Sequence, residues 1–431
     1  MPDNKKLAKL KAKYEKQIAA YQNVDYSSLD VSHGFATDGV LGGFREVVTK
    51  IRYTFGLQFL LGILGGLLFS IAVVAGIYAT KAVGDTEAQA SRLWIRTMIM
   101  GMIIPGGVIL MTFLGGTLFT RHCFATLPTM LGVTKKRILF KGMAAVLFGN
   151  FIGSLILGVI FVGTGAYKDN QFTTRLLEIA NQNLFTVGDK IFPQFSATGD
   201  LNYSGIGGGI WVQTIFASLI SGFLCGILAS GTGVVTHADK NPLVGIVVTF
   251  FCVLYYVLSN YSHGPSNMFY FWSLLFMKWS HPETLTIFNE LGPAVQNLSS
   301  GGGQLAPGMI EITDWSGVGL NFSMVFFACA LLPSIVGNWI GGGIVMPGVY
   351  YVNNREYVQL LAGKMKLENS QEQLREIIAM TQGPVNQGLP TLESTNTLNE
   401  PKLNKDFESK FEVEEVFLKT KKPKKPKKSE K

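Results

Sequence analysis

The chain has 431 residues, of which 48% are hydrophobic and only 15% charged, with 49 glycines and a formal net charge of +8. A water-soluble domain of this length needs more charge to cover its surface, so the composition excludes an ordinary soluble protein. The apolar residues gather in blocks long enough to cross a bilayer, which takes about 20 residues. The composition therefore predicts an all-α integral membrane protein.

Six apolar blocks predict six transmembrane helices. They lie at residues 56–78, 94–118, 138–166, 211–236, 243–278 and 319–350. Together they define a membrane domain over residues 56–350. A polar cytoplasmic segment, 1–55, precedes it, and a basic cytoplasmic tail, 351–431, which we expect to be disordered, follows it.

Two of the six segments are predicted to be broken helices. The second contains Pro105-Gly106-Gly107 and ends at Gly115-Gly116, and the fifth is interrupted at Ser262-His263-Gly264-Pro265. Within lipid, a broken helix is tolerated only where protein or a watery cavity satisfies the freed backbone groups. Two breaks therefore indicate a pathway.

The connections between the segments indicate the orientation. The connection after the second segment carries five basic residues and no acid, whereas residues 279–318 carry acids but no Lys or Arg. Basic residues favour the cytoplasmic side of a membrane. We therefore expect a multi-pass plasma-membrane protein with both termini in the cytoplasm.

A short motif occurs twice, once in the third segment and once in the sixth. Gly149-Asn150-Phe151-Ile152-Gly153 returns as Gly337-Asn338-Trp339-Ile340-Gly341. Three segments per repeat is an odd number, so the two three-helix halves must be inverted relative to each other, as in many transporters. The alternative is a chance match between two glycine-rich helices.

His263 is the main candidate for a functional residue, because it lies deep within an apolar segment, where an ionisable group is costly. A neutral imidazole there can donate to a substrate oxygen or become protonated. The alternative is a structural histidine bonded to a carbonyl freed by Pro265. A half-helix is expected to begin near Gly264 and run through Asn267, with its positive dipole end facing the middle of the protein.

Thr120 is the candidate gate in the first half, because its hydroxyl can both donate and accept and so can respond to His263. The neighbouring Leu118 and Phe119 are expected to form an apolar constriction. The alternative is that Thr120 only caps the helix that follows. Two helix N-termini aimed at one region would favour an anion without a fixed charge.

In combination, these residues resemble the formate/nitrite transporter family. The matching pieces are Gly115-Gly116-Thr117-Leu118-Phe119-Thr120, Gly149-Asn150, His263 with Asn267-Met268-Phe269, and Gly337-Asn338. The resemblance implies an aquaporin-like protomer, a homopentamer with one pore per subunit, and passage of formate, nitrite, hydrosulfide or lactate-type anions, often with a proton.

The resemblance also assigns roles to residues. It matches Thr120 with the family's gating threonine, His263 with its central histidine, and Leu118, Phe119 and Tyr256 with pore constrictions. Asn150 and Asn338 are expected to pack helices near the pore.

The sequence departs from the family pattern at several positions. Thr117 stands where the family usually has an acid, Gly226 where an asparagine is expected, and Ser262 where a glutamate often precedes the histidine. Ile210 aligns near the family's vestibule lysine. These differences bear on substrate and selectivity more than on fold.

The expected partners are a small anion, with formate first, a proton and membrane lipid. No metal or cofactor is predicted, because the four cysteines are scattered and no His/Cys cluster appears. The lysine- and proline-rich end, Lys419–Lys431, is interpreted as a solvated tail, and nucleic acid is not an expected partner because no aromatic residues interleave to stack bases.

Three other classes of function remain as alternatives to anion transport. The first is a neutral-solute channel for water or glycerol, which would not need proton coupling. An enzyme is argued against by the absence of an Asp or Glu deep inside a segment. A receptor is argued against only by the repeat and the broken helices.

Overall fold

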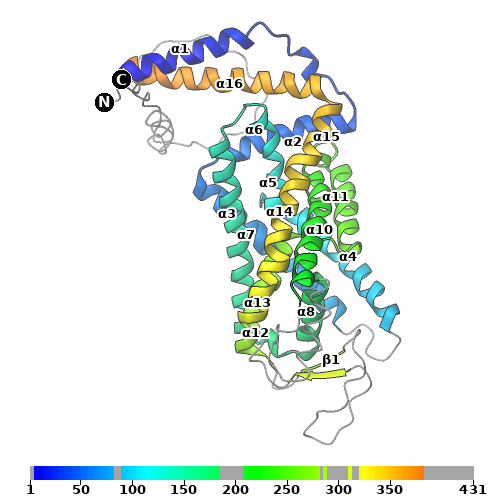
Figure 1. Cartoon of the computed structure of the whole chain (residues 1–431). Coiled ribbons are helices and arrows are strands. Elements are labelled where there is room, and N and C mark those ends of the chain that lie inside the picture. Colours follow the sequence, from blue (N-terminus) through cyan, green and yellow to red (C-terminus); the bar gives the residue numbers. More distant parts are fainter. Residues whose placement is uncertain are drawn as a thin grey trace, which may run out of the picture. The chain divides into compact units, whose positions relative to one another are not determined.

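The computed structural model describes residues 4–81, 89–184, 207–281, 285–288, 309–312 and 320–382 (Figure 1). By its contacts the chain divides into two units, residues 1–374 and residues 375–431. The description below concerns the first unit. Of the second, the structure describes residues 375–382, which end the last helix.

The described chain is almost entirely helical. The helices up to residue 184 are α1 (Asn4–Tyr21), α2 (Phe35–Ile51), α3 (Phe55–Thr80), α4 (Gln89–Leu114), α5 (Phe119–His122), α6 (Thr126–Met130), α7 (Lys136–Thr164) and α8 (Asn170–Asn183). Those from residue 207 onward are α10 (Gly208–Val235), α11 (Pro242–Leu258), α12 (Gly264–Ser280), α13 (Leu320–Phe326), α14 (Leu332–Trp339), α15 (Met346–Asn353) and α16 (Arg355–Gln382).

Shorter elements join these helices. Single 3₁₀ turns form η1 (Ser27–Asp30), η2 (Cys123–Ala125) and η3 (Ala166–Lys168), and π-helical stretches form η4 (Phe327–Leu331) and η5 (Ile340–Val345). The π-helical stretches lie within one helical run from α13 to α15. Strands β1 (Leu285–Phe288) and β2 (Met309–Ile312) pair antiparallel, with Leu285 opposite Ile312.

Five of the described helices are long and apolar enough to cross a bilayer, judged by length and composition. They are Phe55–Thr80, Trp94–Leu114, Lys136–Thr164, Gly208–Val235 and Phe322–Asn353. They coincide with the first, second, third, fourth and sixth predicted segments. The fifth predicted segment is divided between α11, which is apolar but shorter, and α12.

Glycine lets the long helices approach closely, as the four-residue spacing predicts. α3 packs against α7, where a Cβ on Gly66 would lie 2.3 Å from the carbonyl oxygen of Asn150. α10 packs against α14 in the same way, where a Cβ on Gly226 would lie 2.4 Å from the carbonyl oxygen of Asn338. Any larger residue at either glycine would push two helix backbones apart.

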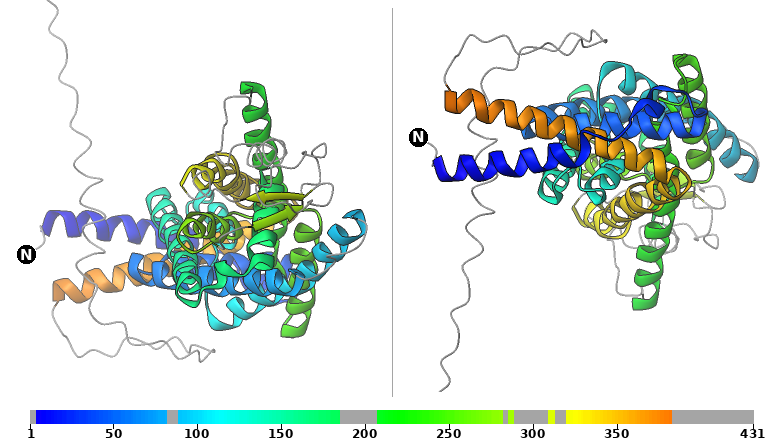
Figure 2. Two further views of the ribbon diagram at one scale, coloured as in Figure 1. Left: turned by 90° about the horizontal axis from the view of Figure 1, so that it is seen from below. Right: turned by 90° about the horizontal axis from the view of Figure 1, so that it is seen from above.

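The C-terminal part of the described chain contains a helix that the sequence did not predict. Residues 351–431 were expected to be disordered, but α16 forms over Arg355–Gln382. Within the first unit α1 lies beside α16 (Figure 2), and Ser370 Oγ donates to Gln17 Oε1 at 3.1 Å. The predicted basic end, Lys419–Lys431, lies outside the described residues.

Candidate functional site

The helical structure is interrupted at two places that share one backbone geometry. α4 runs through Pro105 without interruption and ends just before Gly115, which has a φ of 80°. α11 ends shortly before Asn260, which has a φ of 51°. Glycine and asparagine are the residues that enter this left-handed region most readily. Each break therefore begins at a residue suited to turn the chain out of its helix.

Asn150 of α7 satisfies the backbone groups freed at the first break. Its Nδ2 donates to the carbonyl oxygens of Gly62 (2.8 Å) and Thr117 (2.9 Å), and its Oδ1 accepts from the amide of Phe119 (2.8 Å). The side chain is completely buried. One amide group thus joins α3, α7 and the start of α5.

Asn338 of α14 does the same at the second break. Its Nδ2 donates to the carbonyl oxygens of Gly222 (2.7 Å) and Ser262 (3.2 Å), and its Oδ1 accepts from the amide of Gly264 (2.8 Å). The first amide of α12, like that of α5, is therefore already bonded to a side chain. These two amides are therefore not available to bind an anion, and the anion-binding role of the two helix ends stays a prediction.

The structure brings Thr120 and His263 together. Thr120 Oγ1 lies 3.3 Å from His263 Nε2, and Ser266 Oγ lies 3.0 Å from Nδ1 on the other side of the ring. The imidazole also lies between two aromatic rings, those of Phe69 (centroids 4.8 Å apart) and Tyr256 (5.2 Å). Thr120 is 1% exposed and His263 3% exposed, so the pair is enclosed by protein.

The two hydroxyls determine what the imidazole can do. Each hydroxyl can donate or accept a hydrogen bond. His263 can therefore hold its proton on either nitrogen, or carry two protons, without leaving a buried nitrogen unsatisfied. No carboxylate takes part in the contacts that the structure describes for Thr120 or His263.

Asn267 lies beside the pair but is engaged elsewhere. Its Nδ2 donates to Ser262 Oγ (2.8 Å) and Ser334 Oγ (3.2 Å). The backbone amide of Ser262 in turn donates to Ser221 Oγ at 2.8 Å. The serine that replaces the family's glutamate thus belongs to a network of small hydroxyls that anchors the second break.

The three expected constriction residues are all buried, and their role as a constriction stays a prediction. Leu118 and Tyr256 belong to the same buried apolar cluster as Phe69 and Phe269. Phe119 is equally buried but belongs to the cluster around α2. The Tyr256 hydroxyl has no hydrogen-bond partner among the described residues.

Arg121, which follows Thr120, forms a polar junction that sequence inspection missed. Its guanidinium donates to Glu46 Oε2 (2.9 Å), Thr112 Oγ1 (2.9 Å) and Thr236 Oγ1 (3.0 Å). Glu46 also pairs with Lys50 at 2.7 Å. Burial alone would raise the pKa of the Glu46 carboxyl, but the charges of Arg121 and Lys50 hold that pKa at about 2. This junction ties α2 to the helix that carries Thr120.

The remaining departures from the family pattern have structural counterparts. The amide of Thr117 donates to the Leu61 carbonyl at 3.0 Å, while its hydroxyl is buried without a partner among the described residues. Gly226 sits at the α10–α14 crossing. Ile210 is partly buried against the main apolar cluster.

The cysteines and acids of the described chain do not form a metal site. Among the described residues, no group of three or more His, Cys, Asp or Glu side chains could hold a metal ion. Cys123, Cys225 and Cys329 are buried as free thiols and Cys252 is half-buried.

A buried polar pair inside a bundle of long apolar helices is an arrangement typical of membrane transporters. The chain belongs to the formate/nitrite transporter family, whose model matches residues 42–352. Together with the apolar helices, this makes it a multi-pass membrane protein of a transporter family. The resemblance inferred from the sequence motifs is confirmed.

Two relatives illustrate the similarity. A formate-nitrite transporter of Entamoeba histolytica is 23% identical over 223 residues, which are 51% of this chain and 54% of that protein. The chain thus spans about half the length of this relative. The formate channel FocA of Escherichia coli is 22% identical over 297 residues, 68% of this chain and 85% of FocA.

One solved structure supports the fold, and a second is reported beside it. An FNT family ion channel superposes with a TM-score of 0.51 at 14% identity, covering 74% of this chain and 99% of that chain. A pentameric formate channel with formate bound gives a TM-score of 0.48 at 20% identity, covering 69% of this chain and 97% of that chain.

Proposed function

We propose that the protein is a channel-like transporter for small monovalent anions of weak acids, with formate first and nitrite, lactate or hydrosulfide as further substrates, and that transport is linked to a proton. The observation that carries the proposal is the Thr120–His263 pair, buried where the two helix breaks meet. A titratable group at such a depth is costly to maintain unless it serves function.

The apolar surroundings support proton linkage. An anion that enters a low-dielectric region has its pKa raised, because desolvation disfavours the charged form. Formate can then take a proton, directly from water or through His263, and cross as formic acid. Thr120 and Ser266 can exchange donor and acceptor roles as the ring changes its proton, so they would keep the imidazole in place throughout.

The architecture proposed for this function is a pair of inverted three-helix repeats in six spans, with the second and fifth broken. The support is the recurrence of the same contacts: Asn150 bridges the first break as Asn338 bridges the second. The basic connection after α4 supports a cytoplasmic location for that side and for both termini, in the plasma membrane.

A homopentamer with one pathway per subunit completes the proposal. One of the structural neighbours is a pentameric formate channel. His263 is 3% exposed within one chain and both of its ring nitrogens have partners there, so the site is enclosed without a neighbouring protomer, which supports one pathway per subunit.

The test is flux of formate, nitrite, lactate, hydrosulfide and glycerol into proteoliposomes at several external pH values. We expect saturable formate uptake that rises as external pH falls. His263→Phe should lower it at least about tenfold, as expected for a lost hydrogen bond to a charged group of about 1.5–3 kcal/mol.

His281→Phe, at the end of α12, is the matched control and should transport like the wild type. Unchanged proton-linked uptake in His263→Phe would remove the role assigned to this histidine. Glycerol or water flux without anion uptake would replace the proposal with a neutral-solute channel.

A further inference from the structure

The connection after α7 contains a helix whose position is unusual. Asp169 caps α8 by accepting from the Phe172 amide at 3.1 Å, and its carboxylate also pairs with Lys81 at the end of α3. From there the helix presents one apolar face, because its apolar residues recur at helical spacing. Phe172, Leu176, Leu177, Ile179 and Ala180 are all buried.

The apolar face of α8 packs into the bundle rather than lying on its surface. The Phe172 ring lies on Phe161 of α7 (centroids 5.7 Å apart) and on Tyr78 of α3 (4.9 Å). Just before α8, the hydroxyl of Tyr167 donates to Ser273 Oγ of α12 at 3.1 Å. The segment therefore contacts helices from both halves of the chain.

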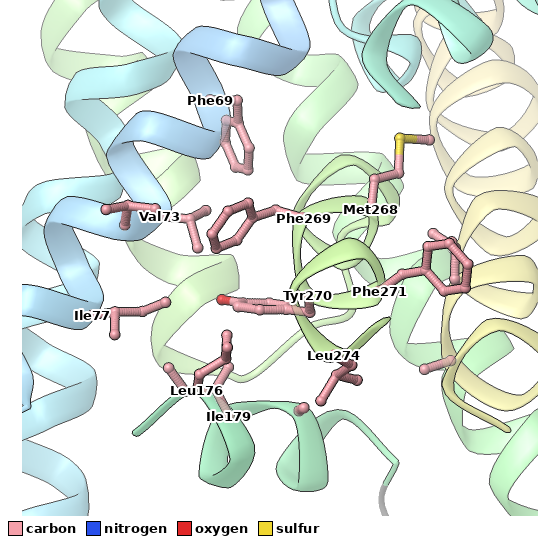
Figure 3. Packing of buried hydrophobic residues seen from close by; sticks show 14 of the residues in the cluster. Phe69, Val73, Ile77, Leu176, Ile179, Met268, Phe269, Tyr270, Phe271 and Leu274 are labelled. Atoms are coloured by element: carbon pink, nitrogen blue, oxygen red, sulfur yellow. The ribbon is translucent and has the colours of Figure 1, made fainter. Parts of the chain in front are cut away.

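A continuous row of buried side chains joins this helix to the candidate site. On α3, Phe69 touches the His263 ring, and Val73 and Ile77 follow at one-turn intervals on the same face. Figure 3 shows Phe269 and Tyr270 of α12 opposite this row, with Leu176 and Ile179 of α8 beyond Tyr270.

None of the row's side chains is open to solvent. The most exposed of them is Ile179 at 6%, and Phe69, Val73 and Leu176 are completely buried. The route from His263 toward α8 is thus filled by side chains in this structure, with α8 across its end.

Charged side chains hold the middle of α8 in place. Glu178 Oε2 accepts from Arg96 of α4 (2.9 Å) and from Arg175 (3.1 Å), and Arg175 is buried. Arg175 Nε also donates to Thr80 Oγ1 of α3 at 3.3 Å. Before its first residue, α8 is connected to α7 through Gly165, whose φ of 70° is left-handed. The helix is thus anchored by a carboxylate near its middle and connected to α7 by a glycine turn.

We propose that α8 is a lid over the outer end of the transport pathway, closed in this structure, and that Glu178 is its latch. The proposal rests on the proposed function, because it takes the row from His263 to Leu176 as the route of the anion. The lid turns about the Gly165 connection. When Glu178 releases Arg96, α8 lifts from Ile77 and Tyr270 and opens the route to the outer solution.

The first test cross-links α8 to α4 at the position of the Arg96–Glu178 ion pair. Arg96→Cys and Glu178→Cys are combined in one protein, because the two native side chains touch each other. A short, reducible bifunctional methanethiosulfonate then bridges them in proteoliposomes. We expect formate uptake to fall at least tenfold on bridging and to return after reduction.

The single-cysteine variants carry the same reagent without a bridge, and they control for reaction at the half-buried Cys252. They should keep their uptake. If the bridged protein transports formate as fast as the unbridged double variant, the proposal that α8 is a lid is overturned. Uptake by the unbridged protein reports separately on the proposed function.

The second test does not depend on transport. Val73→Cys places a thiol in the row beneath α8, and its labelling by a small impermeant thiol reagent measures how often the route is open. Adding Glu178→Gln should raise the labelling rate at least fivefold. Adding Lys81→Gln, which removes the ion pair at the hinge end of α8, should leave the rate within twofold.

These labelling rates test the lid proposal even if the double-cysteine variant does not fold. Equal labelling in the Val73→Cys protein with and without Glu178→Gln would show that α8 is a fixed part of the bundle. An effect of Lys81→Gln as large as that of Glu178→Gln would overturn the assignment of Glu178 as the latch.

Discussion

Two asparagines and the glycines that face them set the geometry of both helix breaks. A buried carbonyl or amide without a partner costs about 1–3 kcal/mol, and each break frees several such groups. Asn150 satisfies two of them at the first break and Asn338 two at the second, and each side chain also donates to a carbonyl of the neighbouring long helix. Gly66 and Gly226 allow the neighbouring helix to come close enough for these short bonds.

This packing predicts that Gly226→Ala is strongly destabilising. The added Cβ would lie 2.4 Å from the Asn338 carbonyl oxygen, and both atoms belong to helix backbones that cannot rotate away. We expect a loss of at least about 1–3 kcal/mol, the usual range for overpacking. The measurement is thermal unfolding of purified protein in detergent.

Gly163→Ala is the matched control, because a Cβ at that position in α7 would meet nothing within 4 Å. It should unfold at the wild-type temperature or slightly above, since alanine favours a helix over glycine by about 0.5–1 kcal/mol. Equal melting of the two variants would mean that the α10–α14 crossing tolerates expansion.

At the scale of elements, the length of the apolar blocks predicted most of the membrane-spanning helices, but it did not predict the amphipathic helix α8. α3, α7 and α10 are apolar runs longer than those found in helices of soluble proteins. α8 is half polar, so none of the six apolar blocks covers it, although the capping Asp169 and the apolar spacing after it are visible in the sequence. Nothing in its spacing says which helices it packs against, because that depends on residues far along the chain.

The α2–α5 junction predicts a pH-independent contribution to stability near neutrality. The Glu46 pKa is held at about 2, against an ordinary value of 4.5, so the carboxylate stabilises the fold above pH 4.5 and loses this contribution only as pH falls toward 2. Glu46→Gln should therefore lower stability by about 1–3 kcal/mol, as for loss of a charged hydrogen-bond partner.

The stability difference should stay constant from pH 8 to pH 5 in thermal melts. Formate uptake by Glu46→Gln should also keep the pH profile of the wild type, because this group does not titrate in that range. Glu15→Gln, in an exposed pair with Lys11, is the control and should change the melting temperature little. A stability difference that shrinks between pH 8 and 6 would contradict the assignment of the charge.

At the scale of the whole molecule, the sequence named candidate residues for the site but not how they meet. His263 stood out because an ionisable group interrupts an apolar segment, and Thr120 because its hydroxyl can both donate and accept beside the break in the second segment. Their contact joins positions 143 residues apart and required the fold. Phe69, Ser266 and Arg121 carried no signal of their own, since an aromatic residue, a serine or an arginine near a helix end has many ordinary roles.

The completeness of the site within one chain predicts independent subunits. Within one chain His263 is already 3% exposed and both ring nitrogens have partners, so we expect that an inactive neighbour removes nothing that the pair needs. In oligomers mixed from wild-type and His263→Phe chains, formate uptake should fall in proportion to the fraction of variant chains. The measurement is flux from co-expressed, differently tagged chains at several known ratios, with His281→Phe as the partner in control mixtures. A much steeper fall would mean that protomers act together, and the route would then have to involve the interface between them.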